Sequence, residues 1–119
     1  MIEIYTDGSA RRNPGPGGWG LLVLKEKTIL KTKSMQYKQA ITNNQMELCA
    51  LLTALHLAST EYKNEWVIIY CDSAYCVNMC NSWIFTWSQN GWQNSKKQQV
   101  ENYELVTAIW DYIQFPVGK

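Results

Sequence analysis

One short segment restricts the fold of this 119-residue chain more than any other: the residues from Trp66 to Cys71 are apolar without interruption. A strand with one face in water alternates apolar and polar residues, whereas a strand covered on both faces, as in parallel sheets, is apolar throughout. The segment therefore predicts a strand that is buried on both faces. Helical patterns lie on either side of it, so the chain is expected to fold as an α/β protein.

The N-terminal third of the chain supplies the rest of the predicted sheet. Residues 2–6 alternate and are rich in residues that favour strands. The loop 7–18 follows, because its glycines and prolines interrupt regular structure. Residues 19–24 and 28–36 are the next two strands, joined by a tight connection. These three strands predict an antiparallel meander.

Helices account for most of the remaining sequence. Thr42, Asn43 and Asn44 can cap the free backbone N–H groups of a helix that ends near residue 60. Its core-facing stripe has the 3–4 spacing of an amphipathic helix and contains Leu48, Leu51, Leu52, Leu55 and Ala58. Further helices are expected over residues 74–81, 83–88 and 100–113, with a polar, lysine-bearing loop at residues 91–99. The order β-β-β-α-β-α-α-α predicts one domain with a mixed sheet and flanking helices.

The composition, 46% hydrophobic and 18% charged residues, is that of a soluble globular domain. The longest apolar runs are far below the ~20 residues that a membrane span needs, and the N-terminus has no features of a secretory signal. We therefore expect a cytoplasmic protein that does not bind a membrane. The four cysteines form no Cys-x-x-Cys pair and there is one histidine, so free, mostly buried thiols are expected in place of a zinc site or disulfides.

Three acidic residues fall where the predicted fold brings side chains together. Asp7 ends the first strand and Asp72 ends the apolar strand, and α/β sheets bind ligands at such strand ends. Glu47 precedes Leu48 near the start of the first helix and is expected to turn towards the sheet. Converging carboxylates repel one another unless a cation lies between them, and oxygen ligands favour Mg²⁺ or Mn²⁺ over zinc. The alternative is that the three acids have structural roles only. Asp7 would then be a turn residue, Asp72 a helix cap, and Glu47 an acid favoured by the helix dipole.

Several motifs resemble type 1 ribonuclease H in their order and spacing. They are Ile4-Tyr5-Thr6-Asp7-Gly8-Ser9, Asn13-Pro14-Gly15-Pro16-Gly17-Gly18, Thr42-Asn43-Asn44-Gln45-Met46-Glu47-Leu48 and Asp72-Ser73-Ala74-Tyr75. The resemblance covers residues 2 to about 113 and implies a ribonuclease H-like mixed sheet, with a three-strand antiparallel meander, a parallel strand and flanking helices. It also implies an endonuclease that cleaves the RNA strand of RNA–DNA hybrids with two divalent ions, Mg²⁺ or Mn²⁺. Asp7, Glu47 and Asp72 would be the catalytic and metal-binding residues.

The same resemblance implies where the hybrid is contacted. The candidate substrate-binding residues are Gly8, Ser9, Asn13, Thr42, Asn43, Asn44, Gln45, Trp83, Lys96 and Lys97. For the asparagines the alternative is helix capping, and for Trp83 it is packing between short helices. If three of the ten acids form the site, seven acids remain against eleven basic residues, and a mildly basic surface suits a polyanionic substrate.

The chain departs from the family after residue 113. The family continues with a fifth strand, a Gly-His loop and a last helix that carries a fourth metal-binding aspartate, whereas this sequence stops at Lys119. Three interpretations stay open: an active enzyme with three acids, a hybrid-binding module impaired in catalysis, and a truncated fragment that needs a partner segment. Without the fifth strand, the edge of strand 66–71 is uncovered, which favours a homodimer joined near Trp66–Cys71 or a tail that covers the edge.

Overall fold

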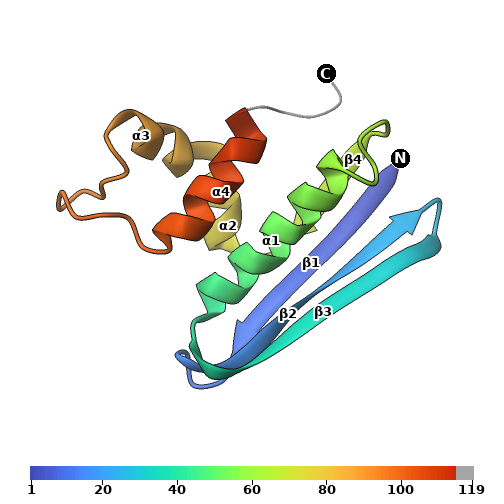
Figure 1. The fold of residues 1–119 in the computed structure, drawn as a ribbon, viewed down its shortest axis with the longest axis horizontal. Coiled ribbons are helices and arrows are strands. Elements are labelled where there is room, and N and C mark those ends of the chain that lie inside the picture. Colours follow the sequence, from blue (N-terminus) through green and yellow to red (C-terminus); the bar gives the residue numbers. More distant parts are fainter. Residues whose placement is uncertain (115–119) are drawn as a thin grey trace.

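A mixed sheet of four strands carries the helices on one of its faces (Figure 1). The computed structural model describes residues 1–114. The strands are β1 (Ile2–Ala10), β2 (Gly15–Lys25), β3 (Thr28–Ile41) and β4 (Val67–Cys71), in the spatial order β3-β2-β1-β4. β1 is antiparallel to β2 and parallel to β4, and β2 is antiparallel to β3. The predicted meander and parallel strand are therefore confirmed.

The helices are α1 (Asn43–Ser59), α2 (Ala74–Asn78), the π-helical segment η1 (Met79–Trp83), α3 (Ile84–Gln89) and α4 (Tyr103–Gln114). The segments α2, η1 and α3 follow one another without a break, where the sequence predicted two separate helices. No glycine or proline interrupts residues 74–89, so the chain bends through a π-turn and stays helical. None of the described helices is long and apolar enough to cross a membrane.

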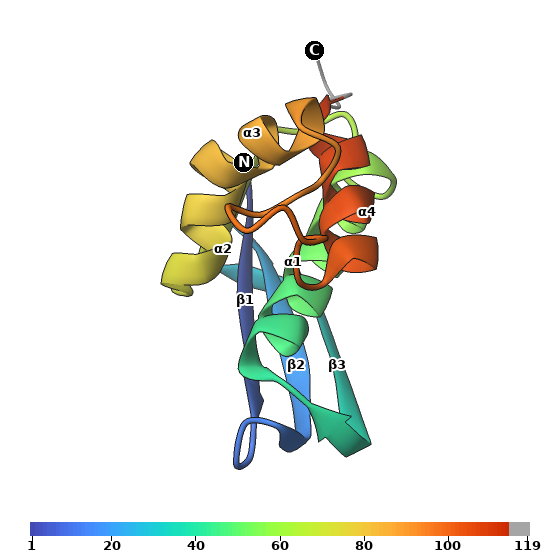
Figure 2. The same ribbon diagram turned by 90° about the vertical axis from the view of Figure 1, so that its left-hand side faces the viewer.

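Helix α1 separates two apolar clusters, and Figure 2 shows α2 and α4 flanking it. Towards the sheet, α1 packs Ala50 and Ala54 against Ile2 and Ile4 of β1. The predicted leucine stripe faces the second cluster, formed with α2, η1, α3 and α4. The stripe faces the core, as expected, and the part of the core that it faces is the helical one. The small alanine side chains let α1 approach the sheet closely, while the larger leucines fill the space between helices.

The predicted loop at residues 7–18 is much shorter in the structure. β1 continues to Ala10 and β2 begins at Gly15, so most of the glycines lie in a strand. A Cβ atom at Gly17 would collide with the carbonyl oxygen of Ser9 on the paired strand. The glycines therefore allow close approach between strands, and do not end them.

β4 is not buried on both faces, which corrects the first sequence prediction. Val67, Ile69 and Cys71 point towards α1 and are half-buried. Ile68 and Tyr70 point to the opposite face and are 39% and 40% exposed. Among residues 1–114, no helix lies on that face of the sheet. The continuous apolar sequence of residues 66–71 therefore does not mean that the strand is buried on both faces.

Candidate metal centre

Asp7, Glu47 and Asp72 converge from three elements, as the sequence predicted. One carboxylate oxygen of each lies within 4.8 Å of the other two. The parallel pairing of β1 with β4 ends at Thr6 and Cys71, so Asp7 and Asp72 are the residues that directly follow the last paired positions. Asp7 does not end β1, as we had expected, because β1 continues along β2. It lies instead where β1 extends past β4.

The start of α1 is fixed against β1 at Gly8, and this contact positions Glu47. A Cβ atom at residue 8 would collide with the carbonyl group of Met46 and would lie 2.7 Å from the backbone nitrogen of Glu47. The backbone N–H of Gly8 donates to Glu47 Oε1 at 3.3 Å and to Asp7 Oδ1 at 3.0 Å. Because glycine has no side chain, α1 can approach β1 closely at this position, and this approach brings the carboxylates of Asp7 and Glu47 together.

The electrostatics of the cluster favour a cation. Glu47 is only 8% exposed, and its pKa is raised from the ordinary 4.5 to about 7. Burial is the main cause, and the charges of Cys71, Asp7 and Asp72 add to it, while the hydrogen bond from Gly8 acts in the opposite direction. Within the described chain, no Lys or Arg nitrogen lies within 4.0 Å of these three acids. The carboxylates are thus left without a compensating positive charge, and their hard oxygen donors fit Mg²⁺ or Mn²⁺.

The carboxylate cluster opens to the surface, because both Asp7 and Asp72 are exposed. A groove of about 870 Å³ runs along β1, β2 and β3 and includes Asp7, but neither Glu47 nor Asp72 lines it. A small-molecule site encloses most of its ligand. An exposed cluster of this kind is instead suited to a group on the outside of a large polymer.

The side chains at the start of α1 are largely used within the protein. Thr42 and Gln45 form a reciprocal capping box, with Gln45 N–H donating to Thr42 Oγ1 at 3.1 Å and Thr42 N–H donating to Gln45 Oε1 at 2.8 Å. Asn43 Oδ1 accepts from the N–H of Ala10 at 2.6 Å, and Asn13 Oδ1 accepts from the N–H of Asn43 at 2.8 Å. The predicted capping is confirmed for Thr42, whereas the Asn43 side chain binds β1 in place of the helix, and the bonds of Asn13 and Asn43 tie the β1–β2 turn to α1.

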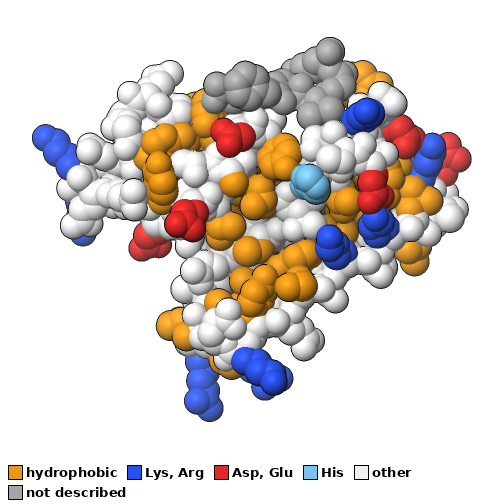
Figure 3. All heavy atoms as spheres, viewed as in Figure 1, with side chains coloured by type: hydrophobic (Ala, Val, Ile, Leu, Met, Phe, Trp, Pro, Cys, Tyr) orange, Lys and Arg blue, Asp and Glu red, His pale blue; other side chains and the backbone are white. Residues whose placement is uncertain are grey.

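The predicted aromatic and basic residues lie in the helical part of the chain after β4: Trp83 ends η1, and Lys96 and Lys97 lie between α3 and α4. Trp83 is 40% exposed and packs edge-on against Tyr75 and at a tilt against Trp87. Lys96 and Lys97 are exposed in the loop between α3 and α4, where Asn94 Oδ1 accepts from the backbone of Lys96. Figure 3 shows basic side chains at the outer end of this projecting loop.

One feature near the carboxylates was missed by the sequence analysis. All four cysteines are free, as predicted, but only Cys76 is buried and the other three are half-buried. Cys71 and Cys76 lie beside Glu47, and the hydrogen bond between the two thiols lowers the pKa of Cys71 and raises that of Cys76. The sequence carried no clear signal for this pair, since four residues separate the two cysteines and this spacing fits no common metal motif.

The fold and the cluster define an α/β protein with three carboxylates gathered beside the end of a parallel strand. Residues 1–115 match the RNase H family model. A Ribonuclease H of Parvibaculum lavamentivorans is 43% identical over 108 residues, which are 88% of this chain and 67% of the relative. A Ribonuclease H of Legionella pneumophila is 43% identical over 111 residues, 91% of this chain and 72% of the relative. The chain therefore belongs to the ribonuclease H family of enzymes.

Solved structures agree with this assignment. A foamy viral protease-reverse transcriptase, solved with double-stranded DNA, superposes with a TM-score of 0.82 and 27% identity, over 97% of this chain and 75% of that one. LC11-RNase H1 in complex with an RNA/DNA hybrid superposes with a TM-score of 0.67 and 27% identity, over 99% of this chain and 79% of that one. The ribonuclease H-like fold expected from the sequence is thus confirmed.

Proposed function

We propose that this protein hydrolyses the RNA strand of RNA–DNA hybrids endonucleolytically, with Asp7, Glu47 and Asp72 as its catalytic and metal-binding residues. The observation that carries the proposal is the convergence of these three carboxylates without a basic partner among residues 1–114. The family and the relative that is solved with an RNA/DNA hybrid support the substrate class.

The chain's own contribution to this reaction is to hold negative charge in a fixed position. Asp7 and Asp72 would hold two Mg²⁺ or Mn²⁺ ions together with Glu47, whose orientation is set by the Gly8 N–H. When bound, a pair of such ions activates a water and stabilises the leaving oxygen of a phosphodiester. The exposed positions of Asp7 and Asp72 leave the site accessible to the backbone of a duplex.

The residues proposed to contact the hybrid differ in how many of their side-chain atoms already form hydrogen bonds within the protein. Thr42 and Gln45 cap each other, and Asn13 and Asn43 each use their side-chain oxygen within the protein. The amide nitrogens of these two asparagines stay available to a substrate. Together with the backbone at Gly8 and Ser9 and with Asn44, they would face the sugar edges of the hybrid, where 2′-hydroxyl groups distinguish RNA from DNA.

The basic side chains would attract the phosphate backbone. Lys96 and Lys97 project from the loop between α3 and α4, and Arg11 and Arg12 lie at the turn after β1. Figure 3 shows Lys and Arg side chains at both of these corners of the molecule. Phosphate contacts of this kind position a duplex without reading its sequence, while Trp83, which is 40% exposed, would contribute its ring surface.

The reaction is tested with a labelled RNA–DNA hybrid in Mg²⁺ and, separately, in Mn²⁺. We expect internal cuts in the RNA strand, none in the DNA strand, and none in double-stranded DNA or single-stranded RNA of the same sequence. Chelation of the metal should stop the reaction. Salt-sensitive hybrid binding without cleavage by the folded protein in either metal would favour the alternative, a hybrid-binding module.

We also propose that a second copy of this chain pairs with the outer edge of β4. β4 pairs only with β1 among the described residues, so no strand within residues 1–114 pairs with its outer N–H and C=O groups. Trp66, next to this edge, is 82% exposed, and Ile68 and Tyr70 present an apolar surface beside it. Antiparallel pairing of two β4 strands across a two-fold axis would satisfy both edges with the same surface.

Light scattering at micromolar concentration tests the dimer. Ile68→Lys is the appropriate variant, because Ile68 is exposed, whereas Ile69 is partly buried against the core and a lysine there would also destabilise the fold. We expect a dimer for the unchanged protein and a monomer for Ile68→Lys. A monomeric unchanged protein would contradict the proposal, and a dimer that survives the substitution would place the interface elsewhere.

A further inference from the structure

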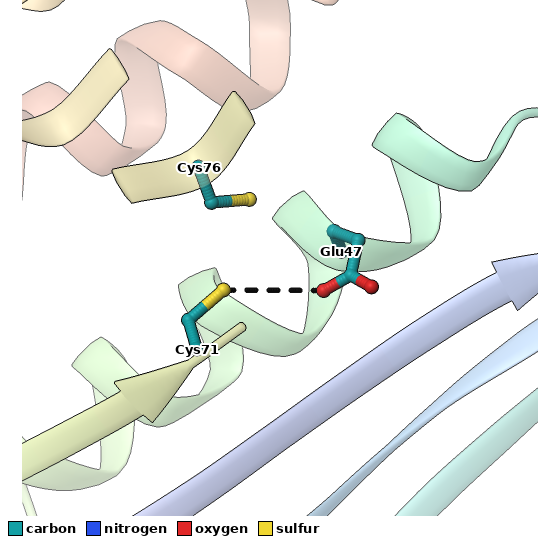
Figure 4. Close-up of side chains that lie close together, drawn as sticks. All are labelled: Glu47, Cys71 and Cys76. Carbon is teal, nitrogen blue, oxygen red and sulfur yellow. Dashed lines mark hydrogen bonds between the residues drawn. The ribbon is translucent and has the colours of Figure 1, made fainter. Parts of the chain in front are cut away.

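Glu47 takes part in a second cluster, on the side of the carboxylates that faces the helices. Cys71 ends β4, and Cys76 lies near the start of α2. The two sulfur atoms and one carboxylate oxygen of Glu47 all lie within 4.8 Å of one another. Figure 4 shows both sulfur atoms directed towards the Glu47 carboxylate. Cys71 Sγ is 3.9 Å from Glu47 Oε2.

This spacing is close to that of a shared tetrahedral ion. With Zn–S of about 2.3 Å and Zn–O of about 2.1 Å, the two ligand atoms are about 3.6 Å apart at the tetrahedral angle. The observed separation differs from that value by only a few tenths of an ångström. Small side-chain rotations would therefore bring the ligands onto one ion.

The two cysteines are held by the backbone and are partly shielded from water. Cys76 is 1% exposed, and its backbone N–H donates to Ser73 Oγ at 3.3 Å at the start of α2. Cys71 is half-buried and is fixed by the pairing of β4 with Thr6 of β1. Ligands on such rigid elements lose little freedom when a metal binds.

We propose that Glu47, Cys71 and Cys76 form a site for a thiophilic divalent cation, Zn²⁺ in the first instance, that is distinct from the three-carboxylate centre but shares Glu47 with it. Thiolate sulfur selects such ions over Mg²⁺. Each thiol would release its proton to solvent as its sulfur binds the metal.

The shared glutamate couples the two metal sites, because both draw on the same carboxylate. A Zn²⁺ ion that holds Glu47 draws a ligand away from the Mg²⁺ or Mn²⁺ ions, so zinc should inhibit the nuclease. This consequence rests on the proposed function, whereas binding of the metal to the cysteines does not.

Binding is tested with Cd²⁺ and fully reduced protein, by following the ultraviolet charge-transfer absorbance of cadmium–thiolate bonds. We expect a signal that saturates at one equivalent. Cys76→Ala should remove most of it and weaken binding at least about tenfold. Cys49→Ala is the matched control, since Cys49 is a half-buried cysteine that packs in the other cluster, between α1 and the sheet. Absence of the signal in the unchanged protein, or equal loss in both variants, would overturn the proposal.

A measurement on the unchanged protein covers the case in which Cys76→Ala does not fold. Saturating Cd²⁺ should slow alkylation of Cys71 at least about tenfold and leave that of Cys49 unchanged, as read by mass spectrometry of the labelled peptides. Equal protection of both cysteines, or of neither, would contradict the site. Excess Mg²⁺ should weaken Cd²⁺ binding, because both ions need Glu47.

The nuclease assay gives the second arm of the test. Zn²⁺ should inhibit hybrid cleavage by the unchanged protein, and Cys76→Ala should need at least about tenfold more Zn²⁺ for half-inhibition relative to its own rate. Equal sensitivity of the two proteins would refute the shared glutamate. If neither protein cleaves the hybrid, the proposed function fails, and the cadmium signal still decides whether the cysteine site exists.

Discussion

Replacing Glu47 with glutamine should stabilise the metal-free protein at neutral and alkaline pH. In the folded state the pKa of Glu47 is about 7, compared with 4.5 for an ordinary glutamate. Each pKa unit corresponds to about 1.4 kcal/mol, so ionising this buried carboxylate costs the fold about 3 kcal/mol. Glutamine has the same shape, can still accept from the Gly8 N–H, and carries no charge to be buried.

The pH dependence gives the sign of this effect. Because the folded pKa lies above the unfolded one, the protonated group favours the folded state, and this stability is lost as pH rises from about 4.5 to about 7. In chelator, Glu47→Gln should therefore match the unchanged protein near pH 4.5 and exceed it by about 3 kcal/mol at pH 8, on the order of 10 °C in Tm.

The assay is urea unfolding across this pH range, with Glu101→Gln as the control because Glu101 is exposed. Added Mn²⁺ should raise the stability of the unchanged protein at pH 8, since the cation favours the ionised carboxylate, and should raise that of Glu47→Gln far less. Parallel pH profiles for Glu47→Gln and the unchanged protein, or a variant that is less stable at pH 8, would refute the account of the site's electrostatics.

Three further variants test how the site is held and how it contacts its substrate. Gly8→Ala places a Cβ against the backbone of Met46. It should lower the free energy of unfolding in urea by about 2 kcal/mol or more and remove most of the cleavage rate. An unchanged free energy of unfolding would show that the packing of α1 on β1 does not depend on this glycine. Thr42→Ala removes the helix cap and should cost about 1 kcal/mol in the same measurement, and a cost near zero would show that the capping box is dispensable. Substituting Lys96 and Lys97 with alanine should weaken hybrid binding and reduce the slope of log affinity against log salt by up to about 2, and an unchanged slope would remove this loop from the interface.

Local patterns were sufficient to predict most of the fold, because each strand and helix has its own signal. The capping residues and the leucine spacing placed α1 within a residue of its observed bounds. The glycine-rich stretch was misread because close strand approach and chain reversal both favour glycine, and pairing partners decide between them. For β4, an apolar sequence predicted burial on both faces, yet burial depends on what packs there, which a single segment does not encode.

The three acids of the candidate site were predictable because Asp7 and Asp72 directly follow the last positions at which β1 and β4 pair, and because the motifs that contain all three resemble ribonuclease H. Asp7 and Asp72 converge because β1 and β4 are neighbours, as the structure confirms, and Glu47 joins them because α1 packs against β1 at Gly8. The cluster of Glu47 with Cys71 and Cys76 was not predicted, because the cysteine spacing fits no common metal motif and the third ligand comes from a distant helix. Such a set becomes visible only when the elements are placed in three dimensions.

The most direct test of the central claim is the rate of hybrid cleavage in Mg²⁺ and in Mn²⁺ by the unchanged protein, Asp7→Asn and Asp111→Asn. Asp111 is exposed on α4 and lies outside the carboxylate cluster, so it controls for the loss of one negative charge. We predict cleavage by the unchanged protein and by Asp111→Asn, and at least a hundredfold loss for Asp7→Asn, about 2.7 kcal/mol of transition-state stabilisation. Cleavage that survives Asp7→Asn in a folded protein would contradict the role of the three carboxylates.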